Sequence, residues 1–246
     1  MLIYKLGDVL DVHREQQIDV LFIQETHHDS NSVCIRRLRA DGFSVVDRPR
    51  PRLHDATLAN NYGGIVAVAV SGVRLTALDL GVKPGTFEFL CVRIVSGPSS
   101  CVAAIIYRPG SDEVPSEFFD DLSDVLERLV TLVDPVLVVG DVNVKLQRPT
   151  DPNTRNFVDI LAIHGLVNCV SAVTHNRGGS LDVVACDLPQ PVVSVLDVGL
   201  SDHRLLTWSA SLTRPCPIHV GDQSTVEELR RYFVSRCFAL VAALPQ

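Results

Sequence analysis

The chain has 246 residues, 46% of them hydrophobic and 21% charged, which is the composition of one large globular domain or two small ones. The net charge of −7 argues against a protein that holds nucleic acid through bulk positive charge, although a carboxylate site that binds a metal adds negative charge of its own. No apolar run approaches the roughly 20 residues that a membrane span needs, so we expect no association with a membrane.

The hydrophobic pattern changes period several times along the chain, and each change marks a boundary between expected elements. Apolar residues at helical spacing predict helices at 6–17, 32–39, 111–133 and 156–164. Short apolar or alternating runs predict strands at 18–24, 43–47, 64–70, 73–80, 87–95, 101–107, 136–140, 166–170, 181–186, 192–198 and 204–210. Because the strands from 64 to 107 follow one another without helices, we expect antiparallel pairing there. This order of elements predicts an α/β sandwich, two packed sheets flanked by helices.

The last part of the chain has a different character. Residues 213–223 are rich in proline and polar residues and are expected to form a linker. Residues 224–227, Ser-Thr-Val-Glu, match a capping box, in which a hydroxyl and a glutamate satisfy the first amides of a helix. We therefore predict a domain over residues 1–212, followed over residues 213–246 by a linker and a helix. The apolar stripe expected for that helix is Val226, Leu229, Phe233, Cys237, Leu240 and Leu244.

The seven cysteines are scattered through the chain and include no CxxC pair. An odd number of cysteines without a pattern indicates reduced thiols, and hence a nuclear or cytoplasmic protein. Neither the cysteines nor the adjacent His27 and His28 have the spacing of a zinc site, so we expect no zinc.

The most informative stretch is 136–143, Val-Leu-Val-Val-Gly-Asp-Val-Asn. Its apolar run predicts a strand buried on both faces, and Gly140 removes a side chain where another group must approach the backbone closely. In an extended chain Asp141 and Asn143 point the same way and should lie side by side. A carboxylate that deprotonates water and an amide that holds an oxygen suit a phosphate ester. The alternative is a strand that stops in an Asx-type turn.

Four more polar clusters lie at the ends of expected strands, where sheet scaffolds carry function. Each cluster alone has an ordinary explanation, such as a solvated acid, a surface hydroxyl, a turn residue or a half-buried histidine. Their combination in one order along the chain indicates a single site. The clusters are Gln24-Glu25-Thr26, Tyr107-Arg108-Pro109, Ser180-Leu181-Asp182 and Ser201-Asp202-His203.

With Gly140-Asp141-Val142-Asn143, these clusters resemble the endonuclease/exonuclease/phosphatase superfamily over about residues 6–210. The segments 18–26 and 174–182 and the Tyr-Arg-Pro element are most similar to the apurinic-like endonuclease domain of non-LTR retrotransposons. The resemblance implies a DNase I-like fold, a four-layer α/β/β/α sandwich of two mainly antiparallel sheets. It also implies DNA as the partner and cleavage of a phosphodiester by water with Mg²⁺, or alternatively Mn²⁺. We expect no stable protein partner.

The same resemblance assigns a role to each polar side chain. Glu25 would bind the metal, and Asp202 would coordinate or orient it. Asp141 would align or deprotonate the attacking water, and Asn143 would orient that water or hold a phosphate oxygen. His203, with its tautomer fixed by Asp182, and Tyr107 would contact the phosphate. Apart from the resemblance, Arg50, in a loop where arginines alternate with prolines, Arg108 and Arg177 are candidates for binding the substrate.

The leading hypothesis is a retrotransposon endonuclease domain that nicks target DNA. The alternatives are a phosphatase of the same superfamily, acting on a lipid or nucleotide, and an inactive truncated copy. The last alternative arises because the family carries an asparagine on a first central strand, ahead of the helix expected at 6–17, and Met1 begins where that strand should be ending. Its loss should expose apolar neighbours and leave ladder groups unpaired. We further expect the terminal helix to be a remnant of the connector to a reverse transcriptase, and therefore poorly buried.

Overall fold

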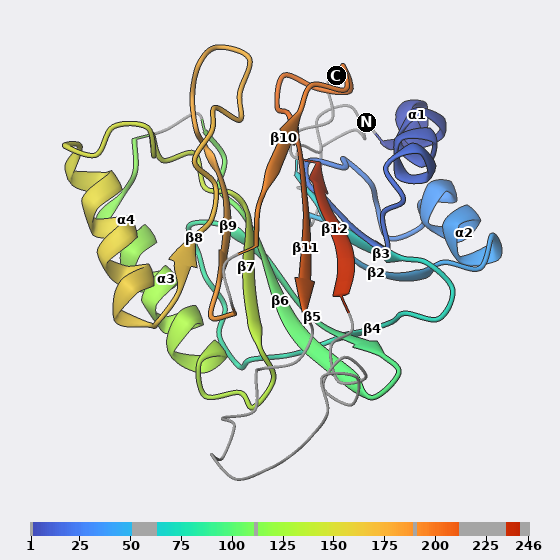
Figure 1. Cartoon of the computed structure of the whole chain (residues 1–246), viewed down its shortest axis with the longest axis horizontal. Coiled ribbons are helices and arrows are strands. Elements are labelled where there is room, and N and C mark those ends of the chain that lie inside the picture. Colours follow the sequence, from blue (N-terminus) through green and yellow to red (C-terminus); the bar gives the residue numbers. More distant parts are fainter. Residues whose placement is uncertain (1, 51–62, 111–112, 189–190, 212–234, 242–246) are drawn as a thin grey trace, which may run out of the picture.

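The computed structural model describes residues 2–50, 63–110, 113–188, 191–211 and 235–241, which form four layers (Figure 1). Two six-stranded sheets pack face to face, and a pair of helices covers the outer face of each sheet. The helices are α1 (Leu2–Glu15), α2 (Val33–Ala40), α3 (Ser116–Leu129) and α4 (Pro152–Ile163). The strands are β1 (Val20–Ile23), β2 (Ser44–Arg48), β3 (Ile65–Ala69), β4 (Arg74–Ala77), β5 (Glu88–Ser96), β6 (Ser99–Tyr107), β7 (Val136–Asp141), β8 (Val167–Asn168), β9 (Asp182–Cys186), β10 (Ser194–Leu196), β11 (Leu205–Ser211) and β12 (Ser235–Val241). The predicted four-layer sandwich is confirmed.

Sheet B has the strand order β4-β5-β6-β7-β9-β8, and its neighbours pair antiparallel except β6 and β7. Helix α3 connects β6 to β7, and such a crossover is what allows two strands to run parallel. The apolar stripe of α3 is fully or nearly fully buried against this sheet, as its spacing predicted. The buried stripe consists of Phe118, Leu122, Val125, Leu126 and Leu129. The predicted helix and its stripe continued to Val133, but the helix ends at Leu129 and Val133 is 90% exposed, so this part of the prediction is wrong.

Helix α4 begins four residues earlier than the pattern predicted, and its first turn shows why. The Asp151 carboxylate accepts a hydrogen bond from the Asn153 N–H at 2.9 Å, and Pro152 occupies the first helical position. An aspartate cap and a proline with its fixed φ together begin a helix efficiently. The helix ends just before Gly165, whose φ of +71° is the left-handed conformation that glycine adopts without strain.

Sheet A has the order β10-β11-β12-β1-β3-β2, and β12 corrects two predictions. Residues 235–241 form a strand, not part of a helix; the rest of the predicted linker and helix lies outside the described residues. Strand β12 runs parallel to β1 and antiparallel to β11. The ladder of β1 is therefore paired on both sides, and Phe22 and Leu206 on the flanking strands are fully buried. The expected open place in the sheet is thus occupied by a strand that is paired on both sides.

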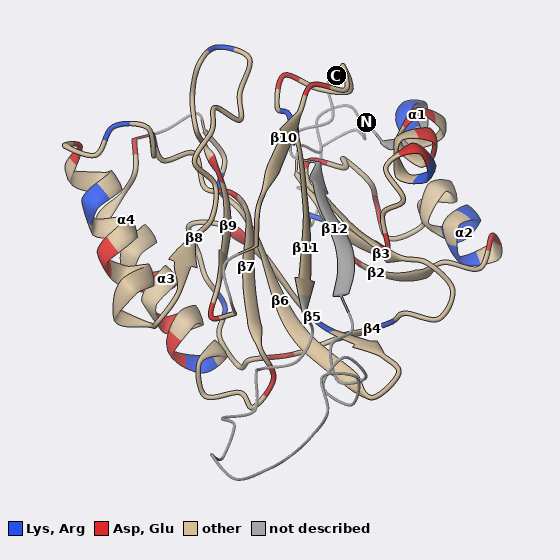
Figure 2. Cartoon of the chain, viewed as in Figure 1, with Lys and Arg blue, Asp and Glu red and all other residues tan. Residues whose placement is uncertain are grey.

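Apolar side chains fill the space between the two sheets. Phe22 stacks on Trp208 with ring centroids 6.4 Å apart, and Ile105 and Val139 meet them from sheet B. Figure 2 shows that most of the length of strands β1 to β11 carries no charge and that lysine, arginine, aspartate and glutamate lie mainly on the helices, in the loops and near the strand ends. This separation is expected when both faces of each sheet are covered, because such strands consist of nearly continuous apolar runs.

The structure also describes the state of the cysteines and the character of the helices. The five cysteines whose side chains the structure describes carry free thiols: Cys34, Cys91, Cys101, Cys169 and Cys186. Among the helices described, none has the length and apolar character needed to cross a membrane.

Candidate active site

The polar clusters predicted from the sequence meet at one end of the sandwich. In sheet B, Tyr107 ends β6 and pairs with Asp141 at the end of β7, and Asp141 pairs with Asp182 at the start of β9. In sheet A, Glu25 follows β1 and His203 precedes β11. The His203 Nε2 lies 3.7 Å from an Asp141 carboxylate oxygen, and the Tyr107 hydroxyl donates to Glu25. Both sheets therefore contribute to one site.

Gly140 permits the close approach that its position predicted, and the approaching group is the side chain of Gln24. A Cβ at Gly140 would lie 1.8 Å from the Ile106 carbonyl oxygen and 2.6 Å from the Gln24 Nε2. The Gln24 amide donates to that carbonyl and accepts the Asp141 N–H at 3.0 Å. This fully buried side chain joins sheet A to sheet B directly beneath the site. Sequence reasoning did not find this role, although glutamine at the end of a buried strand needs partners for its amide.

Strand β7 ends in the Asx-type turn that was the ordinary explanation of this stretch, and the turn itself brings the two polar residues together. The Asp141 carboxylate accepts from the Asn143 backbone N–H at 2.9 Å and from its Nδ2 at 3.0 Å. Asn143 has a φ of +50°, a strained conformation for a residue with a side chain. Its Nδ2 also donates to the Arg108 carbonyl at 2.7 Å. With both amide protons engaged, Asn143 orients Asp141 and has no proton left for a phosphate oxygen.

His203 is held by Asp182, as the resemblance implied. Its Nδ1 lies 2.9 Å and 3.2 Å from the two Asp182 oxygens, and both side chains are almost fully buried. Burial lowers the pKa of His203, but the hydrogen bond and charge of Asp182 outweigh burial and raise that pKa to about 9. The imidazole is therefore a cation at neutral pH. Burial and the charge of Asp182 raise the pKa of the Asp141 carboxyl well above its usual value, against the opposing charge of His203.

Two hydroxyls shape the loops that carry these groups. The Ser201 hydroxyl accepts from the His203 N–H at 2.8 Å and donates to the His203 carbonyl at 2.9 Å, which closes the turn before β11. The Thr174 hydroxyl accepts from the Leu181 N–H at 3.0 Å, just before Asp182. Each loop is thus fixed by a short polar side chain beside the residue that enters the site.

Glu25 lies just after β1, in a segment whose backbone conformation is strained. Glu25 and His27 both have a φ of +49°, in the left-handed region that residues with side chains rarely adopt. The Tyr107 hydroxyl donates to one Glu25 oxygen; burial and the charge of Glu25 raise the pKa of that tyrosine, so it stays a donor. The structure places the Tyr107 hydroxyl on Glu25, and the phosphate contact predicted for Tyr107 stays a prediction. Burial lowers the pKa of His27 to about 4, so the ring beside Glu25 is neutral.

A chain of polar contacts behind Glu25 fixes this segment, and no pattern in the sequence predicted these contacts. The Thr26 hydroxyl lies 2.5 Å from the His28 Nδ1, and the His28 Nε2 lies 3.3 Å from Asp47 on β2. Arg39 of α2 donates to the same carboxylate at 2.6 Å. The hydrogen bond from His28 lowers the pKa of Asp47, which keeps the carboxylate charged and available as an acceptor. Helix α2 is in this way connected to the backbone that carries Glu25.

The three arginines predicted to bind substrate have different surroundings. Arg108 is 3% exposed, and its guanidinium donates to the Val142 and Asn143 carbonyls at 2.8 Å, so it ties β6 to the turn after β7 and is no substrate contact. Arg50 forms an ion pair with Glu88, whose carboxylate accepts the Gly64 N–H at 2.7 Å. Arg177 is exposed in the loop before β9. Arg177 alone of the three keeps its side chain in solvent beside the site.

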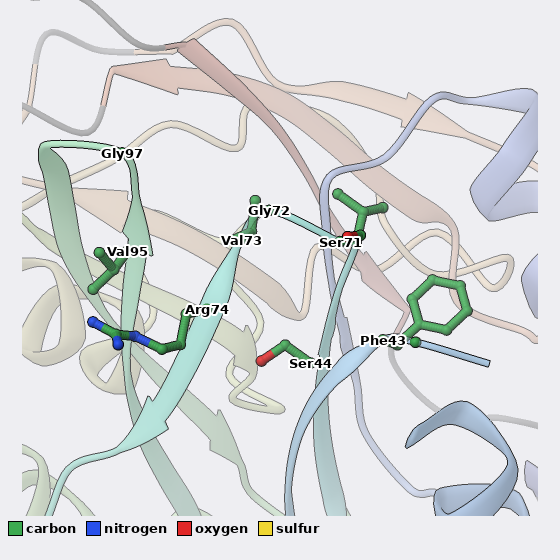
Figure 3. A pocket seen from close by; sticks show the side chains of 10 residues that line it. Phe43, Ser44, Ser71, Gly72, Val73, Arg74, Val95 and Gly97 are labelled. Carbon is green, nitrogen blue, oxygen red and sulfur yellow. The ribbon is translucent and has the colours of Figure 1, made fainter. Parts of the chain in front are cut away.

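A pocket of about 470 Å³ lies away from these groups, at the opposite end of the sandwich (Figure 3). It is formed by the start of β2, the turn between β3 and β4, and the turn between β5 and β6. Phe43, Ser44, Ser71 and Arg74 are among its lining residues, which include no carboxylate, histidine or cysteine. The pocket therefore offers no group for the chemistry that the strand ends support.

The described residues offer two groups of three side chains whose ligand atoms lie within 4.8 Å of one another. One consists of Asp141, Asp182 and His203; the other consists of His175, Asp202 and His203. The carboxylate of Glu25 belongs to neither group, and its side chain is 24% exposed. Mg²⁺ is commonly bound by one or two carboxylates that leave several coordination positions to water. Glu25 and Asp202 each offer a partly exposed carboxylate of the kind that such an ion takes.

A buried carboxylate and a histidine–aspartate pair meet at one end of this four-layer sandwich, and such a group of titratable side chains marks a candidate catalytic site. The sequence model of the Endonuclease/Exonuclease/phosphatase family matches residues 4–203, and the chain belongs to this family. None of the curated protein sequences matches the chain. The resemblance inferred from the sequence is confirmed at the level of the family.

Several solved structures share the fold. A 3′ phosphatase, NExo, from Neisseria, solved with a product DNA hairpin, has a TM-score of 0.59 and 15% identity, over 82% of this chain and 93% of that chain. The endonuclease domain of TRAS1, a telomere-specific non-LTR retrotransposon, has a TM-score of 0.56 and 15% identity, over 80% and 88%. An AP endonuclease from Archaeoglobus fulgidus has a TM-score of 0.54 and 17% identity, over 83% and 93%. At these identities the likeness shows the fold alone.

Proposed function

We propose that the chain is a metal-dependent endonuclease that nicks DNA, of the kind found in non-LTR retrotransposons. The observation that carries this proposal is the position of Asp141, between the orienting amide of Asn143 and the imidazole of His203. A carboxylate in this position can take a proton from water while a cation beside it faces the phosphate. The segments 18–26 and 174–182 support the retrotransposon assignment, and the TRAS1 domain has the same fold.

The residues divide the reaction between them. Asp141 aligns the attacking water and accepts its proton; its raised pKa makes it a better base than an exposed aspartate. His203, cationic and held by Asp182, contacts the phosphate and stabilises the charge that develops on its oxygens. Asn143 keeps the Asp141 carboxylate in position.

Glu25 and Asp202 would hold the ion, which we propose to be Mg²⁺, with Mn²⁺ as a substitute. The bound cation would supply positive charge to the phosphate oxygens. Tyr107 keeps Glu25 in place through its hydroxyl, so Tyr107 serves the metal side of the site. A nuclear or cytoplasmic location and DNA as the partner are parts of the same proposal.

The experiment is a nicking assay on supercoiled plasmid with purified chain and Mg²⁺. We expect nicking that EDTA abolishes and that Asp141→Ala reduces by about 10²–10⁴-fold, the usual contribution of a positioned base. Asp159→Ala, which removes an exposed aspartate on α4, is the matched control and should nick at the wild-type rate.

Two other results would contradict the proposal. Folded protein that releases phosphate from a DNA 3′ end, a nucleotide or a lipid without nicking would favour the phosphatase alternative, which the fold shared with the NExo 3′ phosphatase also supports. Folded protein without either activity would favour the inactive copy.

A further inference from the structure

His175 lies against the site although no role was predicted for it. It belongs to the loop between β8 and β9, and its backbone forms a β-bridge with His203. The two imidazoles meet edge to face, with centroids 4.8 Å apart and planes at 85°. The His175 Nε2 lies 3.3 Å from an Asp202 carboxylate oxygen. One side chain therefore contacts two residues of the candidate site.

The backbone fixes which nitrogen of His175 carries the proton. The Arg177 N–H donates to the His175 Nδ1 at 3.0 Å, so that nitrogen is an acceptor. A neutral imidazole with an accepting Nδ1 carries its proton on Nε2. The protonated Nε2 is therefore the nitrogen that lies 3.3 Å from the Asp202 carboxylate oxygen. Metal coordination through Nε2 would require the opposite tautomer and the loss of the Arg177 contact.

The backbones of the two loops are also joined. The Asn176 N–H donates to the Asp202 carbonyl at 2.8 Å, and the Arg204 N–H donates to the Thr174 carbonyl at 2.7 Å. The His175 N–H itself donates to Gly179 at 2.9 Å. These bonds hold the imidazole of His175 at a fixed place relative to Asp202.

Asp202 needs this support more than the other acids of the site do. Its side chain is 48% exposed, whereas those of Asp141 and Asp182 are 2% and 1% exposed. An exposed carboxylate has several open rotamers, and each rotamer points its oxygens to a different place. Hydrogen bonds to carboxylates and histidines around a metal often decide how well it is bound.

We propose that His175 is a positioning residue, which holds the Asp202 carboxylate beside the His203 imidazole in the orientation that binds a divalent cation. The site then contains two linked histidine–aspartate pairs: the buried pair of His203 and Asp182 orients the phosphate contact, and the more exposed pair of His175 and Asp202 orients the metal contact. This inference rests on the proposed metal-dependent function.

Two substitutions separate the polar contact with Asp202 from the packing against His203. His175→Gln keeps an N–H donor at about the reach of Nε2 but removes the ring, whereas His175→Phe keeps a ring against His203 but removes the donor. Calorimetric titration of the full chain with Mn²⁺ reports metal binding without any need for catalysis. We expect His175→Phe to weaken Mn²⁺ binding by about tenfold, as loss of such a partner commonly does, and His175→Gln to stay within about twofold of wild type.

Three results would overturn the proposal: Mn²⁺ binding unchanged in His175→Phe; equal loss in both variants, which would make His175 a ligand itself; or no Mn²⁺ binding by the wild-type chain. A long-range ¹H–¹⁵N spectrum of the imidazoles tests the tautomer of His175 independently. A proton on Nδ1 of His175 would also contradict the proposal. Thermal unfolding of both variants shows whether a loss comes from the fold. If nicking is absent but His175→Phe still weakens Mn²⁺ binding selectively, the positioning role stands and the proposed nuclease function fails.

Discussion

The two sheets have the same number of strands but are assembled from the chain in different ways. All six strands of sheet B come from the continuous stretch between residues 74 and 186. Sheet A collects strands from residues 20–69, 194–211 and 235–241, and β12, the last described strand, lies between β1 and β11. Sheet B therefore depends mainly on contacts between neighbours in sequence, and sheet A depends on contacts across the whole chain.

The residues of the candidate active site come from both sheets. Tyr107, Asp141 and Asp182 come from sheet B, and their pairing is fixed within that sheet. Glu25 and His203 come from sheet A, and their spacing depends on β12 between their strands. Damage to sheet A should therefore affect stability and site together, whereas damage within sheet B can affect the chemistry alone.

The largest expected effect on stability comes from breaking the middle of sheet A. Ala239→Pro removes a backbone N–H from β12 and should lower the free energy of unfolding by about 3 kcal/mol or more, because proline is excluded from central strands. Ala239→Gly, the control, should lower it by about 1 kcal/mol or less. Denaturant unfolding measures both. Equal stability of Ala239→Pro and wild type would show that β12 is not in the sheet.

The next effect concerns the contact of His203 from sheet A with Asp182 from sheet B. The pKa of His203 is raised to about 9, so its stabilising contribution is fully present below pH 6.5 and is lost as the pH rises through 9. We expect the free energy of unfolding to fall by about 3 kcal/mol between pH 6.5 and 10. Asp182→Asn removes the charge that raises the pKa, so this variant should show a much smaller fall. The same slope in both proteins would contradict the assignment.

The smallest effect of the three concerns the direct bridge between the sheets. Gln24→Ala leaves the Asp141 N–H and the Ile106 carbonyl without their partner, and should lower stability by about 2 kcal/mol. Gln147 is a matched control: it accepts the Ser180 N–H at 3.0 Å but is exposed. Gln147→Ala should change stability by about 0.5 kcal/mol or less. Thermal or denaturant unfolding of both variants distinguishes them, and equal losses would show that the bridge is unimportant.

Most elements could be predicted because their signals are local. The period of apolar residues placed α1 to α4 and β1 to β11 within a few residues of their observed bounds. The prediction of a helix over residues 235–241 was wrong because a short apolar run fits a helix and a strand equally well. Cys237 and Leu240 matched the spacing of a helical stripe. The place in sheet A that decides between helix and strand is formed by β1 and β11, which are remote in sequence.

The site was predictable where side-chain direction follows from the strand. Tyr107 faces the space between the sheets, so Arg108, the next residue, had to face the opposite way, and alternation alone would have removed it from the substrate-binding set. The roles of Gln24, His28 and His175 could not be predicted in this way. Each depends on a partner from another element. Gln24 contacts Ile106 and Asp141, His28 contacts Asp47, and His175 contacts Asp202.

The position of β12 also sets an order of events during synthesis. Sheet B can close as soon as residue 186 has left the ribosome, whereas β1 is made among the first strands and waits for a neighbour that emerges more than two hundred residues later. Until then one edge of β1 has free ladder groups, and β11 has the same problem on the side that later receives β12. Nascent chains should therefore be most prone to aggregate, or to need a chaperone, in the interval between the completion of β11 and the arrival of β12.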